Sequence, residues 1–194
     1  ITYSDYNPES VTDYQIDDGS YSSEDLEQTN DTVINDDVRS EFSELESVLE
    51  VYQYIKNNYM MEFYFGSRKG AVGTSAEKAG NDYDIASLLI GILRDRNIPA
   101  RYAKGEIEIT AEQAMEWTAT DDINVAMRVI AALGIPTTGM VSNGETVAVR
   151  LEHIWVEAYV PYTDYRGTGN RSGERLWIPL DASFKKSIHL DGTD

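Results

Sequence analysis

The segment 85–93 constrains the fold most, because its apolar side chains cover a broad face of one helix. These apolar positions recur at intervals of three and four residues and are Ile85, Ala86, Leu88, Leu89, Ile92 and Leu93. A stripe of this width is typical of a helix that is largely buried. Asn97 and the Ile98-Pro99 pair are signals that end such a helix. We therefore expect the core to be built around this helix.

The apolar periodicity elsewhere predicts further helices first and strands later. The predicted helices cover residues 42–59, 85–93, 111–117 and 122–133, and the predicted strands cover 100–109, 137–141, 146–160 and 175–180. A turn at 142–145 joins two of the strands as a hairpin. Segments 66–80 and 162–173 are predicted loops, and the first lacks the glycine spacing of a phosphate-binding loop. This order favours an α+β fold with an antiparallel sheet.

Acidic side chains are concentrated at the start of the chain. Residues 1–39 contain eleven acids and one base, without a sustained apolar period, which is typical of an arm or linker. Residues 40–194 are then the folded domain. The net charge of the whole chain is −18 at neutral pH, so nucleic acid and anionic membrane surfaces are not expected partners.

The 194 residues include no cysteine, which excludes disulfides and every thiol nucleophile. No apolar run reaches the roughly 18 residues that a membrane span requires. Acidity without cysteine suits an extracellular or cell-surface protein. A chain that opens at Ile1 is expected to be a piece of a longer protein with other domains.

Three side chains stand out as candidates for chemistry. His153 lies on a predicted strand, where alternation places it on the same face as Trp155 and Tyr159. His189 lies near the end of the chain, where fraying is usual. Asp82 precedes the buried helix, either as a cap or as a carboxylate kept ionised by the positive helix end. A single histidine on a strand is more often a hydrogen-bonded structural residue than a catalyst.

Three segments of the chain resemble bacterial transglutaminase-like domains. Residues 80–89 (GNDYDIASLL), continuing to 97–102 (NIPARY), resemble the segment of that family that carries the nucleophile. Residues 153–159 (HIWVEAY) are similar to its histidine strand, and residues 177–184 (WIPLDASF) to its aspartate strand. The similarity runs from about residue 45 to 186 in the family's order. It implies a papain-like α+β fold in which Asp82, His153 and Asp181 meet.

The chain departs from this family at the nucleophile. Asp82 stands four residues before Ala86, where the family carries its cysteine. A carboxylate is far less nucleophilic than a thiolate, and its attack on an acyl group would give a labile anhydride. Transglutaminase and cysteine-protease activities are therefore not expected.

The function that the sequence favours is a non-thiol hydrolase acting on an extracellular polymer, most of all a polysaccharide. Outer groups that hydrogen-bond to one imidazole lie about 6–7 Å apart, close to the spacing of carboxylates that leave room for a water in inverting glycosidases. Asp82 would act as the base, and His153 or Asp181 would donate the proton. The candidate sugar-stacking side chains are Trp155, Tyr159, Tyr83 and Trp117.

Two alternatives stay open. In the first, the domain is catalytically inactive, and an imidazolium between two carboxylates anchors a module for binding or architecture. In the second, Asp82, His153 and Asp181 bind a divalent metal, with Asp84 as a fourth ligand. This ranks last because the helix end that stabilises Asp82 opposes a cation. Neither the hydrolase nor the inactive module requires a cofactor.

Overall fold

The computed structural model describes residues 1–7, 17–161 and 175–184. The predicted loop at 162–173 and His189 lie outside these residues. Five strands form one sheet, and β2 and β3 form a separate short parallel pair. The strands are β1 (Thr2–Asp5), β2 (Met60–Met61), β3 (Ala79–Gly80), β4 (Ala100–Thr110), β5 (Thr137–Ser142), β6 (Glu145–Pro161) and β7 (Arg175–Leu180).

The long strand β6 organises the sheet. Along one edge it pairs with β4, and along the other it pairs first with β5 and then with β7, always antiparallel. Only β1 is parallel to its neighbour, β5. Thr137 of β5 pairs with Leu151, and Leu180 of β7 pairs with Val156. Neither strand therefore covers residues 152–155, and this gap in the edge of β6 positions the site.

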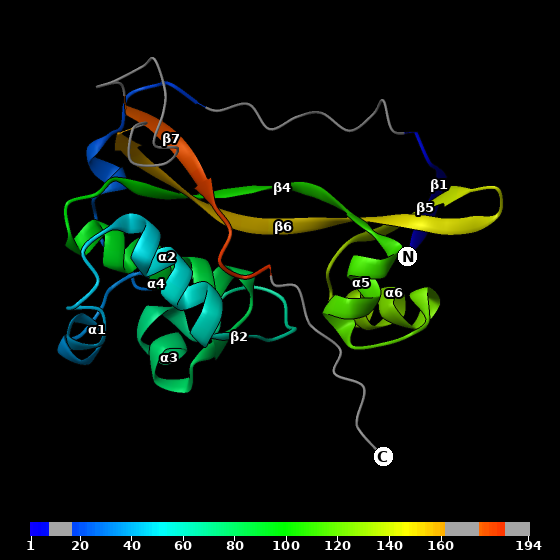
Figure 1. The fold of residues 1–194 in the computed structure, drawn as a ribbon, viewed down its shortest axis with the longest axis horizontal. Helices are drawn as coiled ribbons and strands as arrows, with labels where there is room; N and C mark the ends of the chain where they lie inside the picture. The colour runs from blue at the N-terminus through cyan, green and yellow to red at the C-terminus, as the bar shows by residue number, and fades with distance from the viewer. Residues whose placement is uncertain (8–16, 162–174, 185–194) are drawn as a thin grey trace.

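In the described residues, six α-helices form two groups beside this sheet (Figure 1). The first four gather beside the half of β6 that pairs with β7, and the last two beside the half that pairs with β5. The helices are α1 (Asp36–Glu41), α2 (Val48–Asn58), α3 (Gly70–Glu77), α4 (Asp82–Asp95), α5 (Ala111–Thr118) and α6 (Ile123–Ala132). The predicted α+β class with an antiparallel sheet is confirmed, since β1 alone departs from it.

Helix α4 is the buried helix that the apolar stripe predicts. Asn81 caps it by accepting a hydrogen bond from the Asp84 N–H, and Asn97 ends it in the left-handed conformation at φ 56°. Leu88, Leu89 and Ile90 are fully buried against the neighbouring helices and the sheet. Because the cap lies at Asn81, the helix starts three residues before the predicted stripe and includes Asp82.

Two local predictions are wrong. The predicted helix at 42–59 is helical only from Val48 to Asn58, because Ser47 and Glu50 form a capping box that starts α2 there, and α1 ends at Glu41, before the predicted start. The predicted loop at 66–80 contains α3. Its first N–H groups donate to Asp84, a contact from a later part of the chain that local propensity does not reveal.

The end of the acidic arm lies in the core. Thr32, Ile34 and Val38 are buried, and the Thr32 carbonyl packs against Gly91 of α4. A Cβ at Gly91 would lie 2.2 Å from that oxygen, so only glycine allows this approach. The predicted boundary between residues 39 and 40 therefore does not coincide with the edge of the core. Farther upstream, Asp17 pairs with Arg101 at 2.8 Å.

Burial along β6 changes parity near its middle. Val149 and Leu151 belong to the core beside α5 and α6, whereas Val156 and Ala158 belong to the core beside α4. The pairing of β6 with β4 runs without a register shift, so the predicted alternation of faces holds along the strand, and what changes is which face the helices cover. His153 lies where the covered face of β6 changes, within the edge segment 152–155 that pairs with neither β5 nor β7. Its side chain is buried.

Candidate functional site

Asp82 is the first residue of α4, and backbone N–H groups hold both of its carboxylate oxygens. Oδ1 accepts from the Tyr83 N–H at 2.9 Å, and Oδ2 accepts from the Ile154 N–H at 3.0 Å. Ile154 lies in the β6 gap, so Asp82 takes the place of a strand partner for this N–H. The carboxylate also lies at the positive end of the α4 helix dipole.

His153 is buried between two carboxylates, with 1% of its side chain exposed. Its Nε2 lies 2.9 Å from Asp181 Oδ2 in hydrogen-bond geometry. Its Nδ1 lies 3.2 Å from Asp82 Oδ2, which is an ion-pair distance, but this contact lacks the angle of a hydrogen bond. The structure thus brings together the three residues that the resemblance singles out.

Asp181 follows β7 directly and is fixed by the turn after it. Its Oδ1 accepts from the Ser183 N–H at 3.1 Å, the Ser183 hydroxyl at 2.7 Å and the Phe184 N–H at 3.1 Å. The other oxygen, Oδ2, is left to face His153. This division of lone pairs orients the carboxylate toward the imidazole.

The charges of this cluster reinforce one another. Burial lowers the pKa of His153, but the hydrogen bonds and the charges of Asp181 and Asp82 outweigh burial and raise that pKa to about 9. Burial raises the pKa of Asp181, but the hydrogen bond and the charge of His153 bring the pKa below its ordinary value. At neutral pH the imidazole is therefore protonated, and it cannot serve as a general base.

A pocket of about 260 Å³ opens on this cluster from one side. Asp82 and His153 border it, together with aromatic side chains of the loop 64–66 and of α4. Asp181 does not border this pocket. The void that both carboxylates do border is too small for a water molecule. Solvent reaches both carboxylates, since 20% of the Asp82 side chain and 32% of the Asp181 side chain are exposed, but the void that both border cannot hold a water.

The four predicted sugar-stacking side chains lie in different places. Tyr83 lines the pocket, and Trp155 borders the small void between the carboxylates. Trp117 packs in the core beside α5 and α6, and Tyr159 stacks near Trp177, beside a separate pocket of about 520 Å³. Trp117 and Tyr159 therefore do not line the pocket at Asp82.

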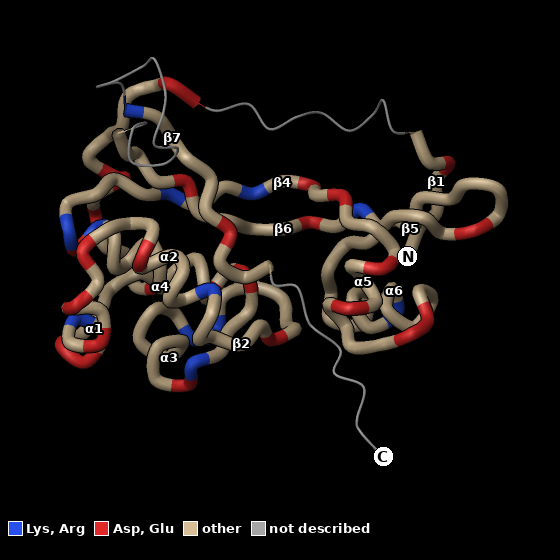
Figure 2. Tube along the Cα trace, in the orientation of Figure 1, with Lys and Arg blue, Asp and Glu red and all other residues tan. Residues whose placement is uncertain are grey.

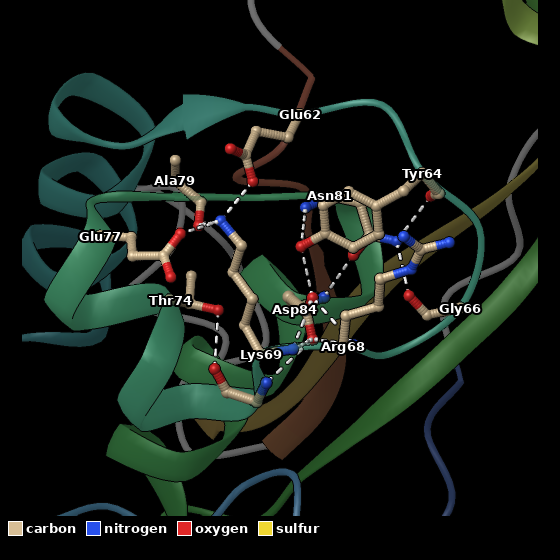
Figure 3. Close-up of polar contacts among 11 residues, drawn as sticks. Glu62, Tyr64, Gly66, Arg68, Lys69, Thr74, Glu77, Ala79, Asn81 and Asp84 are labelled. Carbon is tan, nitrogen blue, oxygen red and sulfur yellow. Dashed lines mark hydrogen bonds and ion pairs between the residues drawn. The ribbon is translucent and has the colours of Figure 1, made fainter. Parts of the chain in front are cut away.

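Sequence reasoning missed two residues of the pocket wall, Tyr64 and Phe65. They lie just before the glycine-rich segment 66–80, and no helical or strand periodicity of apolar residues identifies them as wall residues. Asn81, the residue before Asp82, donates from its side chain to the carbonyls of Tyr64 and Gly66, each at 2.9 Å (Figure 3). The only feature of the sequence that hints at this contact is the polar residue Asn81 immediately before a buried helix.

Asp84 lies two residues after Asp82, but its carboxylate binds the loop before α3 and does not contact His153. It is fully buried, and its carboxylate accepts from the Tyr64 and Ser67 hydroxyls and from the N–H groups of Arg68, Lys69 and Gly70 (Figure 3). It thus ties the 64–70 loop to α4 and begins α3. Within the described residues, no group of three or more His, Cys, Asp or Glu side chains is placed to hold a metal ion.

We expect Asp84→Asn to destabilise the domain by about 2 kcal/mol, because the amide NH₂ would face backbone donors that now meet a carboxylate. Chemical unfolding in urea measures this loss. Asp36→Asn, at an exposed carboxylate in the first turn of α1, is the matched control and is expected to change the free energy of unfolding by less than about 0.5 kcal/mol. An equal, small effect of both substitutions would contradict the anchoring role.

The fold and the site define a class of protein. A buried helix whose first turn faces a histidine on an antiparallel sheet, with an aspartate behind that histidine, is the arrangement of a papain-like α+β domain. The profile of the transglutaminase-like superfamily matches residues 32–182. The chain belongs to this superfamily. Searches of curated proteins and of solved structures found no significant match.

Proposed function

We propose that the chain is a catalytically inactive transglutaminase-like module that serves binding or architecture in a larger protein. Asp82 stands in the cysteine position of the family, and Asp82, His153 and Asp181 form a structural ion-pair cluster. The observation that carries this proposal is the position of the Asp82 carboxylate. Two backbone N–H groups and a protonated imidazole already bind it, and no water fits between it and Asp181.

The chemistry of acyl transfer supports the same conclusion. A thiolate nucleophile requires a sulfur, which this chain lacks. His153 holds its proton up to a pH of about 9, so it would not activate a water at neutral pH. Two backbone N–H groups near the helix start, those of Tyr83 and Ile154, already donate to Asp82 and are not available to a developing oxyanion.

A non-thiol hydrolase of polysaccharides is the second candidate, and one observation favours it. The pocket of about 260 Å³ has aromatic walls and reaches both Asp82 and His153. An inverting mechanism needs two carboxylates on opposite sides of the scissile bond with room for a water between them. Because Asp181 faces away from this pocket, we rank the hydrolase below the inactive module.

A hydrolysis screen separates these two functions. We expect the parent domain to release no reducing sugar from glucans, chitin or xylan, and Asp82→Asn and Asp181→Asn to lower the melting temperature. Sugar release by the parent that is lost in both variants, with unchanged melting temperatures, would instead establish the hydrolase.

We also propose that the protein acts outside the cell or at its surface, with an extracellular polymer and other domains of a larger chain as its partners. The net charge of −18 and the absence of cysteine support this location. In the described part of the chain, no helix has both the length and the apolarity for a membrane span.

Asp82→Cys tests whether the scaffold retains the thiolate position of the family. The protonated His153 and the helix N-terminus would lower the pKa of the new thiol, so iodoacetamide should alkylate it at pH 6 at least about tenfold faster than an ordinary thiol. Asp36→Cys is the matched control, since Asp36 is also the first residue of a helix but has no histidine beside it. Mass spectrometry after timed quenching gives both rates. Equal rates would mean that position 82 does not support a thiolate.

A further inference from the structure

We infer that the pocket over Asp82 is one end of a groove that binds a neutral polysaccharide chain without cleaving it; this rests on the proposed function and names the ligand of that same site. The groove consists of two adjoining pockets. The first is the pocket of about 260 Å³ at Asp82, and the second, of about 380 Å³, lies over β4, β5 and β6. Lys104 and Glu152 border both pockets, so the two pockets adjoin at this ion pair.

Aromatic side chains supply the wall of the first pocket. Phe65 is 55% exposed, which is unusual for a large apolar side chain, and Tyr64 and Tyr83 lie beside it on the same pocket. The Tyr64 hydroxyl is held by Asp84, and the Arg68 guanidinium lies over the Tyr64 ring at 5.1 Å from its centroid. Phe65 is therefore the ring of this wall with the most exposed surface. Flat rings of this kind pack against the C–H faces of a sugar ring, which is apolar on its faces and polar at its rim.

The charged groups of the groove are mostly paired, which favours a ligand without charge. Lys104 and Glu152 form an ion pair at 2.8 Å, and Asp82 faces His153. Glu106 adds one negative charge to the second pocket. Figure 2 shows acidic and basic positions along β4, and β6 likewise carries both, with one arginine among its glutamates. Such a lining offers hydrogen-bond donors and acceptors to hydroxyl groups, while the charge of −18 on the chain opposes an anionic polymer.

The aromatic wall is held in a fixed position relative to Asp82. Asn81 binds the carbonyls of Tyr64 and Gly66, and Asp84 binds the next residues of the same loop (Figure 3). The residues on either side of Asp82 therefore anchor the wall that faces it. A wall fixed in this way loses little conformational entropy when a ligand binds, as expected for a preformed binding site.

Isothermal titration calorimetry of the 194-residue chain tests this inference with cellohexaose, maltohexaose and chitohexaose as neutral probes and decalysine as a cationic probe. We expect at least one hexasaccharide to bind and Phe65→Ala to weaken that binding about fivefold, the effect of one stacked ring. Met60→Ala is the matched control, because Met60 is 69% exposed and does not border the groove. Melting temperatures of both variants verify that they are folded.

Three outcomes would overturn the groove: no hexasaccharide binds, decalysine alone binds, or Phe65→Ala binds as tightly as the parent. Chromatography of the same mixtures separates this inference from the proposed function. Binding with intact sugars supports both. Binding with fragments that disappear in Asp82→Asn would support the groove and overturn the inactive module, whereas an absence of binding would overturn only the groove.

Discussion

Replacing His153 by Gln is expected to cost the domain about 3 kcal/mol in free energy of unfolding, the largest loss for a single side chain of the site. The imidazole is buried, and on either side of it lie Asp82 and Asp181, whose two negative charges are offset in part by its single positive charge. Glutamine fills a similar volume and can donate a hydrogen bond, but it carries no charge. Two partly buried carboxylates would then face each other without a cation, which costs more than the loss of one exposed ion pair.

Urea unfolding of the parent and of His153→Gln measures this difference. Arg39→Gln is the matched control, because Arg39 also bridges two carboxylates, Asp36 and Asp95, but lies at the surface. Its loss is expected to stay below about 1 kcal/mol. If both substitutions lower the free energy of unfolding equally, the cluster around His153 would not be a stabilising ion-pair cluster. The central support for the proposed function would then fail.

The second large effect is a loss of stability at alkaline pH. Despite burial, which lowers the pKa of His153, the two carboxylates raise it from the ordinary 6.5 to about 9 in the folded protein. A group with a raised folded-state pKa binds its proton more tightly when folded. Its contribution is therefore complete below pH 6.5, decreases as the pH rises toward 9, and is absent above that. A shift of this size corresponds to about 3 kcal/mol.

Chemical unfolding at a series of pH values between 6 and 10 would reveal this decrease, and His153→Gln should abolish most of it. A parent whose stability is flat across this range would contradict a protonated imidazole in the cluster.

Asp181 acts in the opposite direction. Burial raises its pKa, but His153 brings the net pKa below the ordinary value, so its contribution is present at neutral pH and lost on acidification. The domain should therefore be most stable in mildly acidic to neutral solution.

The regular elements with strong apolar patterns were predictable from the sequence. Helix α4 and the strands β4, β6 and β7 lie where periodicity places them, because α4 buries one broad apolar face and each strand buries apolar side chains against a helix group. The division between α1 and α2 was not predicted. Phe42 and Leu45 continue the helical spacing, yet they pack on the core from outside a regular helix.

The family resemblance predicted that three polar residues would meet, and they do. Residue chemistry alone would not have joined them, since Asp82 and His153 lie on separate elements and Asp181 follows a third. The resemblance did not indicate the aromatic wall. Tyr64 and Phe65 reach the site through a loop whose position depends on Asn81 and Asp84, and such long-range hydrogen bonds leave no periodic trace in a sequence.

By itself, the sequence determined the chemistry that this protein lacks and the order of its elements. Without cysteine there is no thiolate, and the apolar stripe of α4 requires a core around it. Only the tertiary structure decided what Asp82 does. The gap between β5 and β7 leaves the Ile154 N–H for its carboxylate, and the turn after β7 places Asp181 behind His153, where it does not border the pocket. Which groups share a solvent space depends on how strands pair and end, and that is set by packing across the whole sheet.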